Sequence, residues 1–510
     1  MFIMFSSIVH LKFRLNIYSL IKQEDLNMKK ILLLLLSITL SVSLCACSQN
    51  SAQTQETETA ETAEKTSVPQ KEDIVINETY TSTEDGTHVI EADGETASYS
   101  NIKVEKTGDS SGDEADFYGE NAAVFATDGA TLDLNEIVVE TDGTHANGVF
   151  SYGEGTIVNI SDSVIETSGN CSGGLMTTGG GTMNATNLNI HTTGNSSAAI
   201  RSDRGGGTVN VTKGSYVTEG KGSPVIYSTA DITVSDAYLE STSSQGVVVE
   251  GKNSVTLNNV ELVANNVSKN SDKSDWYQAV MIYQSMSGDA AEGLASFSMK
   301  DGSLLNKNGD VFFVNNTMAT ISLENVSITN EDAEGYFLRA AAAGWGSEGS
   351  NGGHVTMNLT DQTVQGDIIV DEVSTLNMYF KDNSSYTGAI NEDGEAGEVY
   401  VQIEEGSKWT LTADSYVTSL TCTADSINLN GHKLYINGEE YQEGTASIGE
   451  AIEVVIVSSG NGDMQMPGGG PPEGGTPPEG GIPDGGHEPG DGQEPPEKPD
   501  GEKPDKPNNG

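Results

Sequence analysis

The chain has 510 residues, and its 75 acidic residues against 25 basic residues give a formal net charge of −50 at pH 7. This balance argues against nucleic acid and anionic membrane surfaces as partners, and it also repels acidic polysaccharides unless Ca²⁺ bridges them. The simpler interpretation is that the acidity keeps an exposed surface soluble.

The N-terminal segment predicts an exported protein. Residues 1–27 do not form a signal sequence of their own, so we interpret them as an over-long start that precedes Met28. An apolar run, residues 31–44, follows two lysines and is too short for a stable transmembrane helix. It ends in Leu44-Cys45-Ala46-Cys47, which resembles a bacterial lipobox. The resemblance implies a lipoprotein signal peptide over 28–46 and a lipid on the sulfur of Cys47. The alternative is an ordinary signal peptide.

Two further segments lack any apolar periodicity. Residues 47–73 are rich in Thr, Glu, Gln, Ala and Ser, which predicts a disordered tether. Residues 458–510 hold all but two of the 14 prolines, amid Gly, Glu and Asp, and predict a disordered tail. After Cys47 only Cys171 and Cys422 remain, and we expect them to lie too far apart for a disulfide.

Between these segments, residues 74–457 repeat short alternating apolar runs. Aliphatic positions recur at steps of about 25 residues, and each unit holds three runs separated by turn residues. The first track consists of Val124, Val149, Leu175, Ile200, Val225 and Val248. The second track is a series of pairs: Leu132/Leu134, Val158/Ile160, Met183/Ala185, Val209/Val211, Ile232/Val234 and Val255/Leu257. The third track consists of Val138, Ile165, Ile190, Val217, Leu239 and Leu262.

Three alternating runs per repeat predict an all-β parallel β-helix solenoid with three short strands per coil. Stacked coils place equivalent residues about 4.8 Å apart, so identical polar residues can form ladders. Two ladders are predicted on this basis. One is formed by Thr141, Thr167, Thr192, Thr218 and Ser241, and the other by Asp133, Asn159, Asn184 and Asn210. A β-sandwich also has evenly spaced strands, but it does not need the same residue type at the same repeat position.

Arginine marks a candidate ligand-binding patch. The predicted mature chain has three arginines, and two of them, Arg201 and Arg204, lie in one turn. The repeat alignment places Arg201 near Tyr227 of the next coil and Glu250 of the coil after it. The candidate patch consists of Arg201, Asp203, Arg204, Tyr227, Glu250 and Lys252. Arginine suits carboxylates and sugar hydroxyls, and Asp203, Tyr227 and Glu250 are the candidate acid and base residues. The alternative is a salt-bridge ladder that clamps the coils together.

Metal binding has one candidate in the sequence. Asp109, Asp113 and Asp116 provide hard oxygen ligands in one loop, which would suit Ca²⁺, although the spacing is not that of a dedicated calcium loop. The cysteines show no zinc spacing, the seven histidines form no cluster in the sequence, and no hydrolase or P-loop motif is present.

Taken together, the lipobox, the coils and the Gly/Pro tail resemble bacterial surface proteins of the right-handed, pectate-lyase-like β-helix superfamily. Within it they are most similar to clostridial-type carbohydrate-binding or adhesin-like β-helix lipoproteins. The likeness covers about residues 73–457 and is mainly architectural. It implies a protein anchored outside a bacterial, Gram-positive cell, which binds glycans or cell-surface ligands along one long face.

The same resemblance offers an enzymatic alternative. Lyases of the superfamily use several Ca²⁺-binding aspartates and a basic residue, and its glycosidases use two or three close carboxylates. Neither set is complete in this sequence. A polysaccharide lyase or glycosidase that uses the patch around Arg201 is therefore the alternative function, and a structural envelope spacer is a third one.

Overall fold

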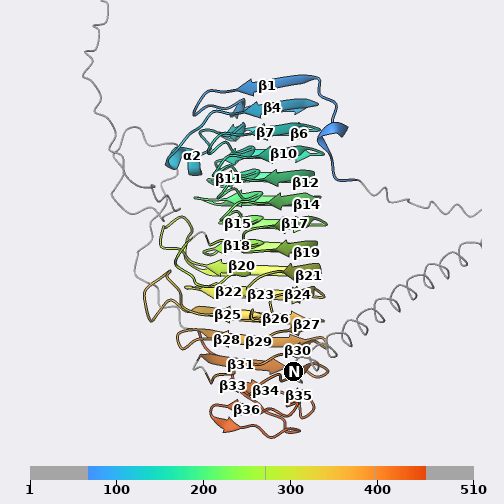
Figure 1. The fold of residues 1–510 in the computed structure, drawn as a ribbon, viewed down its shortest axis with the longest axis vertical. Coiled ribbons are helices and arrows are strands. Elements are labelled where there is room, and N and C mark those ends of the chain that lie inside the picture. The colour runs from blue at the N-terminus through green and yellow to red at the C-terminus, as the bar shows by residue number, and fades with distance from the viewer. Residues whose placement is uncertain (1–66, 270, 395–396, 455–510) are drawn as a thin grey trace, which may run out of the picture. The chain divides into compact units, whose positions relative to one another are not determined.

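A computed structural model describes residues 67–454 except 270, 395 and 396. These residues form parallel β-coils stacked one on another, which can be followed from β1 to β36 in Figure 1. Each complete coil contributes strand segments to three faces, and in four coils one long strand serves two of them. The predicted all-β parallel β-helix is confirmed.

Face 1 is an 11-stranded parallel sheet that contains the first strand of each coil. Its strands are β2 (Ile90–Asp93), β5 (Val124–Thr127), β8 (Val149–Tyr152), β11 (Leu175–Thr178), β13 (Ile200–Ser202), β15 (Ile226–Ser228), β18 (Val247–Glu250), β20 (Gln278–Tyr283), β22 (Asp310–Asn315), β25 (Leu338–Ala340) and β28 (Ile368–Val370). A bridge at Ile390 continues this face to a small sheet of β33 (Ser415–Val417), β36 (Leu434–Ile436) and β37 (Glu439–Glu440).

Faces 2 and 3 share a 19-stranded sheet, because four long strands run through the corner between them. These are β12 (Gly181–Thr192), β14 (Gly207–Thr218), β19 (Ser254–Ala264) and β21 (Leu294–Asn306). Face 2 also contains β3 (Thr96–Ser100), β6 (Thr131–Asn135), β9 (Ile157–Ser161), β16 (Asp231–Ser235), β23 (Thr317–Glu324), β26 (Gly353–Thr360), β29 (Thr375–Lys381), β31 (Glu398–Ile403) and β34 (Ser419–Thr421).

Face 3 is completed by shorter strands and continues into a four-stranded sheet. Its strands are β1 (Glu78–Ser82), β4 (Ile102–Lys106), β7 (Val138–Thr141), β10 (Val164–Thr167), β17 (Tyr238–Ser241), β24 (Ser327–Asn330), β27 (Thr363–Gln365), β30 (Ser385–Thr387), β32 (Lys408–Thr410) and β35 (Ile427–Asn428). Two helical segments are described, the 3₁₀ turn η1 (Lys71–Asp73) and α2 (Asp113–Phe117).

The strand register confirms the second aliphatic track completely and corrects the other two. Ile200 pairs with Ile226 rather than with Val225, and Ile226 then pairs with Val247 rather than Val248. In the third track Ile190 pairs with Tyr216, which is fully buried, whereas Val217 is only partly buried. The third track also starts one residue later than predicted, since Ile165 pairs with Val139 and not with Val138. Because side chains alternate along a strand, a shift of one residue exchanges the core and surface positions.

Tyr216 fits the core because its hydroxyl donates to the carbonyl of Lys213 at the corner, 3.1 Å away.

The two predicted polar ladders differ in their hydrogen bonds. The Asn ladder is confirmed, since Asn159 donates to Asp133, Asn184 to Asn159 and Asn210 to Asn184, at 2.8 to 3.0 Å. The Thr residues are in register and buried, but they do not bond to one another. The hydroxyls of Thr167, Thr192 and Thr218 instead donate to a carbonyl five residues later in their own coil. These threonines therefore close turns, while the asparagines link coils.

Both ends of the described chain lie against the β-helix. Lys71 forms ion pairs with Glu140 and Glu166 on face 3, so the last residues of the predicted tether belong to the folded unit. At the other end, Ile452 exchanges two backbone hydrogen bonds with the side chain of Asn377 on face 2. The predicted start 1–27, signal peptide 28–46, Cys47 and tail 458–510 lie outside the described residues. Within the described part, no helix is long and apolar enough to cross a membrane.

Candidate functional site

The outer side of face 1 is covered, and the predicted patch lies under this cover. Alternate residues of the face 1 strands point outward, and six of these side chains are apolar and buried: Phe125, Phe150, Met176, Val248, Met281 and Phe313. They pack in two clusters outside the main core. Trp276 and Trp345, from the segments after β19 and β25, cover the second cluster. Arg201 and Tyr227 occupy the outward positions between the clusters.

Arg201 and Asp203 come together as predicted, but they form a closed pair. Nη2 and Nε of Arg201 lie 2.6 and 3.2 Å from the same carboxylate oxygen of Asp203. The two side chains are only 15% and 5% exposed. Burial raises the pKa of Asp203, and the charge and hydrogen bonds of Arg201 offset only part of that rise. The pair leaves little surface of either group for a ligand.

Arg204 connects two covering segments that are distant in the sequence. Its guanidinium lies 2.6 Å from Asp289, in the segment after β20, and 3.0 Å from Asp113 of α2. It also lies over the ring of Phe117, 3.6 Å from the ring centre. Arg339 forms a third pair, with Asp310 at 2.6 Å. All three arginines of the described part therefore pair with aspartates of face 1 or of the segments that cover it, which favours the salt-bridge clamp over a ligand-binding patch.

The other predicted patch residues divide into a buried group and an exposed one. Glu250 is 1% exposed and accepts hydrogen bonds from the hydroxyls of Tyr227 and Tyr283, the latter at 2.9 Å. Burial raises the pKa of Glu250, although hydrogen bonds from Ser285 and both tyrosines oppose the rise. A carboxyl group of this kind suits a general acid, but this one is closed off from solvent. Lys252 is exposed and stands outside this group.

The three aspartates predicted to bind Ca²⁺ do not converge. Asp109 accepts a hydrogen bond from the backbone of Thr144 at 2.7 Å, Asp113 pairs with Arg204, and Asp116 faces His145. Each carboxylate thus has a different partner. Within the described residues, these three side chains do not form a group that could share a metal ion.

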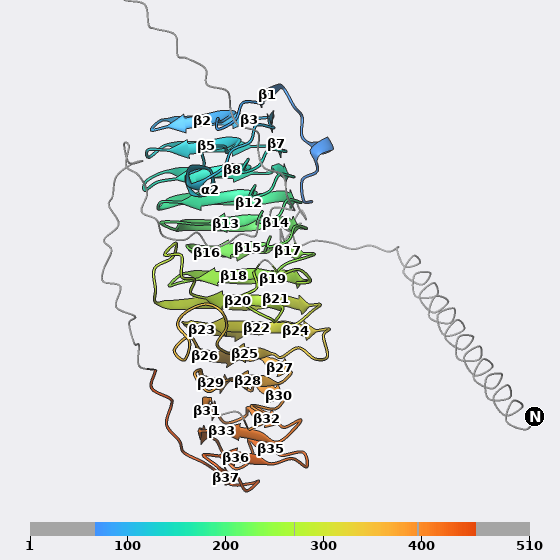
Figure 2. The ribbon, with the colours of Figure 1, turned by 60° about the vertical axis from the view of Figure 1, so that its left-hand side comes forward.

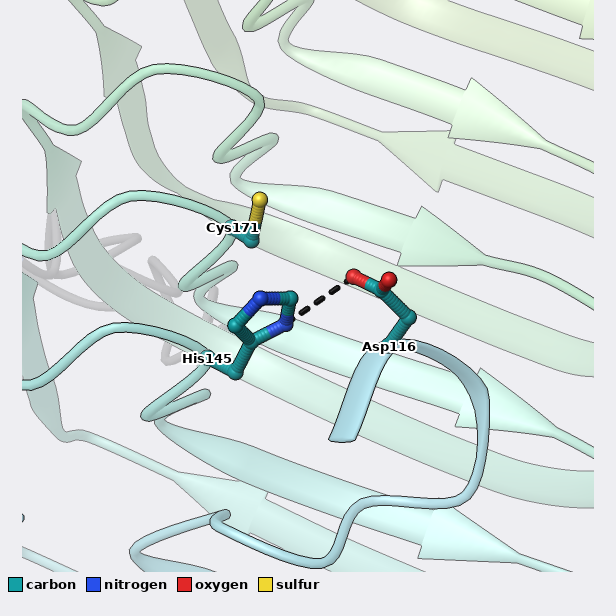
Figure 3. Close-up of side chains that lie close together, drawn as sticks. All are labelled: Asp116, His145 and Cys171. Atoms are coloured by element: carbon teal, nitrogen blue, oxygen red, sulfur yellow. Dashed lines mark ion pairs between the residues drawn. The ribbon is translucent and has the colours of Figure 1, made fainter. Parts of the chain in front are cut away.

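Asp116 instead belongs to a cluster that the sequence did not indicate. Its carboxylate, the ring of His145 and the thiol of Cys171 offer ligand atoms that all lie within 4.8 Å of one another, as Figure 3 shows. Nδ1 of His145 lies 2.9 Å from the Asp116 carboxylate. Cys171 and Cys422 are both free, as expected from their separation.

Face 2 is more open than face 1, although its outward residues Asn377 and Tyr400 are buried near the segment at Ile452. One outward column runs along almost its whole length, and none of its side chains is buried. It consists of Ser98, Asp133, Asn159, Asn184, Asn210, Thr233, Thr256, Ser298, Ser322, Asn358, Tyr379, Gln402 and Thr421. We name this set the polar column. Ser298, Ser322 and Asn358 also line a shallow surface depression, beside Lys300 and Glu324. Figure 2 shows how strands from the whole length of the stack lie one above another.

Comparisons with known proteins give no relative. The chain matches no protein-family model, no curated protein and no solved structure.

Proposed function

We propose that this protein is a lipid-anchored surface protein that binds glycans along face 2. The observation that carries the proposal is the polar column, in which hydroxyl and amide side chains repeat at the strand spacing of about 4.8 Å. Such groups donate and accept hydrogen bonds, as sugar hydroxyls do. An extended polymer could lie along the column and make the same contact on successive coils.

The charge of the column favours a neutral glycan. Although the chain has a net charge of −50, Asp133 is the only carboxylate in the polar column. At the depression, the charges of Lys300 and Glu324 pair with each other at 2.7 Å. Lys381, which donates a hydrogen bond to Asn358 at 3.3 Å, is one cation beside the column. An acidic polysaccharide could contact this lysine but would be repelled by the acidic rest of the molecule. We therefore expect neutral glycans to bind better than acidic ones.

Binding without turnover fits the covered face 1. A glycosidase or lyase must bring its acid and base groups into contact with the sugar. Asp203 and Glu250 are 4% and 1% exposed, and both already have partners. The lipobox that ends at Cys47 supports the anchored location.

The test is affinity for neutral and acidic polysaccharides, measured with the purified chain and two double variants. Ser298→Ala with Asn358→Ala removes two polar groups beside the depression. Because each neutral hydrogen bond contributes about 0.5–1.5 kcal/mol, we expect affinity for a bound neutral glycan to fall by roughly tenfold. The control, Ser327→Ala with Thr329→Ala, removes two exposed hydroxyls from face 3. It should leave affinity unchanged.

Two results would contradict the proposal. One is that no neutral glycan binds the wild-type chain. The other is that both double variants weaken binding equally, which would place the site elsewhere. Release of reducing sugar by the wild-type chain would instead support the enzymatic alternative.

A further inference from the structure

The cluster of Asp116, His145 and Cys171 is built by the corner between faces 3 and 1. His145 and Cys171 occupy the same corner position on successive coils, with φ of 57° and 54°. Their backbone amides bond to equivalent carbonyls of the next coil, those of Asn170 and Asn195. Coil stacking therefore places the imidazole and the thiol one above the other, at a spacing of about 4.8 Å. α2 lies beside this corner and adds Asp116 from a third segment.

His145 is buried beside two other possible metal ligands. The residue is only 8% exposed, and its Nδ1 atom lies 2.9 Å from the carboxylate of Asp116. Nδ1 points to the side where Asp116 lies, and the thiol of Cys171 is also close by, as Figure 3 shows.

We propose that Asp116, His145 and Cys171 bind one divalent transition-metal ion of the Zn²⁺ type, with a fourth position open to water. One nitrogen, one sulfur and one oxygen ligand suit Zn²⁺, whereas Ca²⁺ and Mg²⁺ select oxygen ligands alone. The thiolate and the carboxylate together would balance the charge of the ion. The ligand atoms of the three residues already lie within 4.8 Å of one another, so one ion could reach all of them.

The surrounding charges are compatible with a cation. Arg201 acts on both Asp116 and Cys171, but its charge is balanced by Asp203 at 2.6 Å. Burial raises the pKa of the Cys171 thiol, so the cluster without metal does not hold an activated thiolate. Burial would also raise the pKa of Asp116, but the contact with His145 and the charges of His145, Arg201 and Arg204 outweigh it and lower that pKa. A metal ion would deprotonate the thiol on binding.

The test is metal binding by the purified full chain after treatment with a chelator. We expect one Zn²⁺ or Co²⁺ per chain, and a thiolate-to-metal charge-transfer band with Co²⁺. Cys171→Ser is a mild variant, because Ser196 already occupies the same corner position one coil further on, with φ of 55°. His145→Asn keeps a residue type that tolerates positive φ. Each variant should weaken Co²⁺ binding by more than about 100-fold, the upper limit for loss of a second-shell partner.

Matched controls separate this site from the other thiols and imidazoles. Cys422→Ser changes a buried cysteine far along the chain, and His191→Asn changes an exposed histidine that pairs with Glu219. Both should retain the cobalt band. Zn²⁺ should also slow alkylation of Cys171 and raise the melting temperature of the wild-type chain, since it binds only the folded site.

Three results would overturn the proposal. They are the absence of stoichiometric binding, a cobalt band that survives Cys171→Ser, and binding of Ca²⁺ in preference to Co²⁺. If His145→Asn prevents folding, Asp116→Asn on α2 tests the same ligand set at a partly exposed position. Failure of glycan binding would leave the metal result unaffected, because face 2 and this corner share no residue.

Discussion

Replacement of Arg201 by methionine should destabilise the protein strongly, because it leaves the carboxylate of Asp203 buried without its cation. Methionine keeps the apolar stem of the side chain and removes only the charged head. Two charge-assisted hydrogen bonds are lost, at 2.6 and 3.2 Å. Each is worth about 1.5–3 kcal/mol, while Asp203 keeps one bond from the backbone of Arg204 at 3.1 Å. We therefore expect a loss of about 3–4 kcal/mol, within the range found when one partner of a buried pair is removed.

The double variant Arg201→Met with Asp203→Asn should recover most of this loss, because no uncompensated charge remains. In the single variant the pKa of Asp203 should rise further. An acid with a raised pKa in the folded state stabilises the fold while it is protonated. The stability that Arg201→Met loses relative to the wild type should therefore be small at low pH and should grow as the pH rises through the folded pKa of Asp203. Lys300→Met, which breaks an exposed pair with Glu324, should change stability little.

The assay is urea unfolding followed by tryptophan fluorescence and by circular dichroism. Solenoids can unfold in parts, and the three tryptophans report on different regions. Trp276 and Trp345 lie in the cover of face 1, whereas Trp409 is fully buried in the core. A change of less than about 1 kcal/mol in the single variant, or a double variant less stable than the single one, would refute the buried clamp.

Three other variants test the fold, the buried acid and the anchor. Ile200→Asp should lower the free energy of unfolding by more than about 4 kcal/mol, because it buries an unpaired charge. The control Thr212→Asp changes an exposed residue and should leave stability unchanged. Equal melting temperatures of the two variants would mean that the register is wrong. Glu250→Gln should stabilise the protein relative to the wild type increasingly as the pH rises above 4.5. The folded protein raises the pKa of the Glu250 carboxyl, so ionisation of this group destabilises the wild-type fold in that range. A difference in urea unfolding that does not depend on pH would count against this. Cys47→Ala should release the protein from the membrane fraction, and unchanged partitioning in detergent would rule out a lipoprotein.

Local sequence determined the coil architecture. Alternating residues on every strand, and residues such as Asn187 and Asp236 that tolerate positive φ at corners, recur with a nearly constant period. That period was enough to predict three strands per coil, the buried pairs of face 2 and the Asn159 ladder. It did not decide single-residue offsets, since Val225 with Ile226 and Val217 with Tyr216 are adjacent apolar residues. Only the packing of neighbouring coils selects which of them enters the core.

The character of the candidate sites depended on contacts that no local pattern encodes. The sequence correctly placed Tyr227 beside Arg201 on the next coil, because stacking follows from the period. The register then places Val248, and not Glu250, beside Tyr227, and Glu250 reaches this tyrosine only through its hydroxyl. No local pattern indicates that the group is covered, since the cover relies on pairs such as Arg204 with Asp289, which are 85 residues apart. The cluster of Asp116, His145 and Cys171 was missed for the same reason. His145 and Cys171 are 26 positions apart and could have been aligned as one coil repeat, but Asp116 reaches them only because α2 folds against their corner. The repeat period can be seen in the sequence alone, whereas tertiary packing decides where the inserted segments contact the coils.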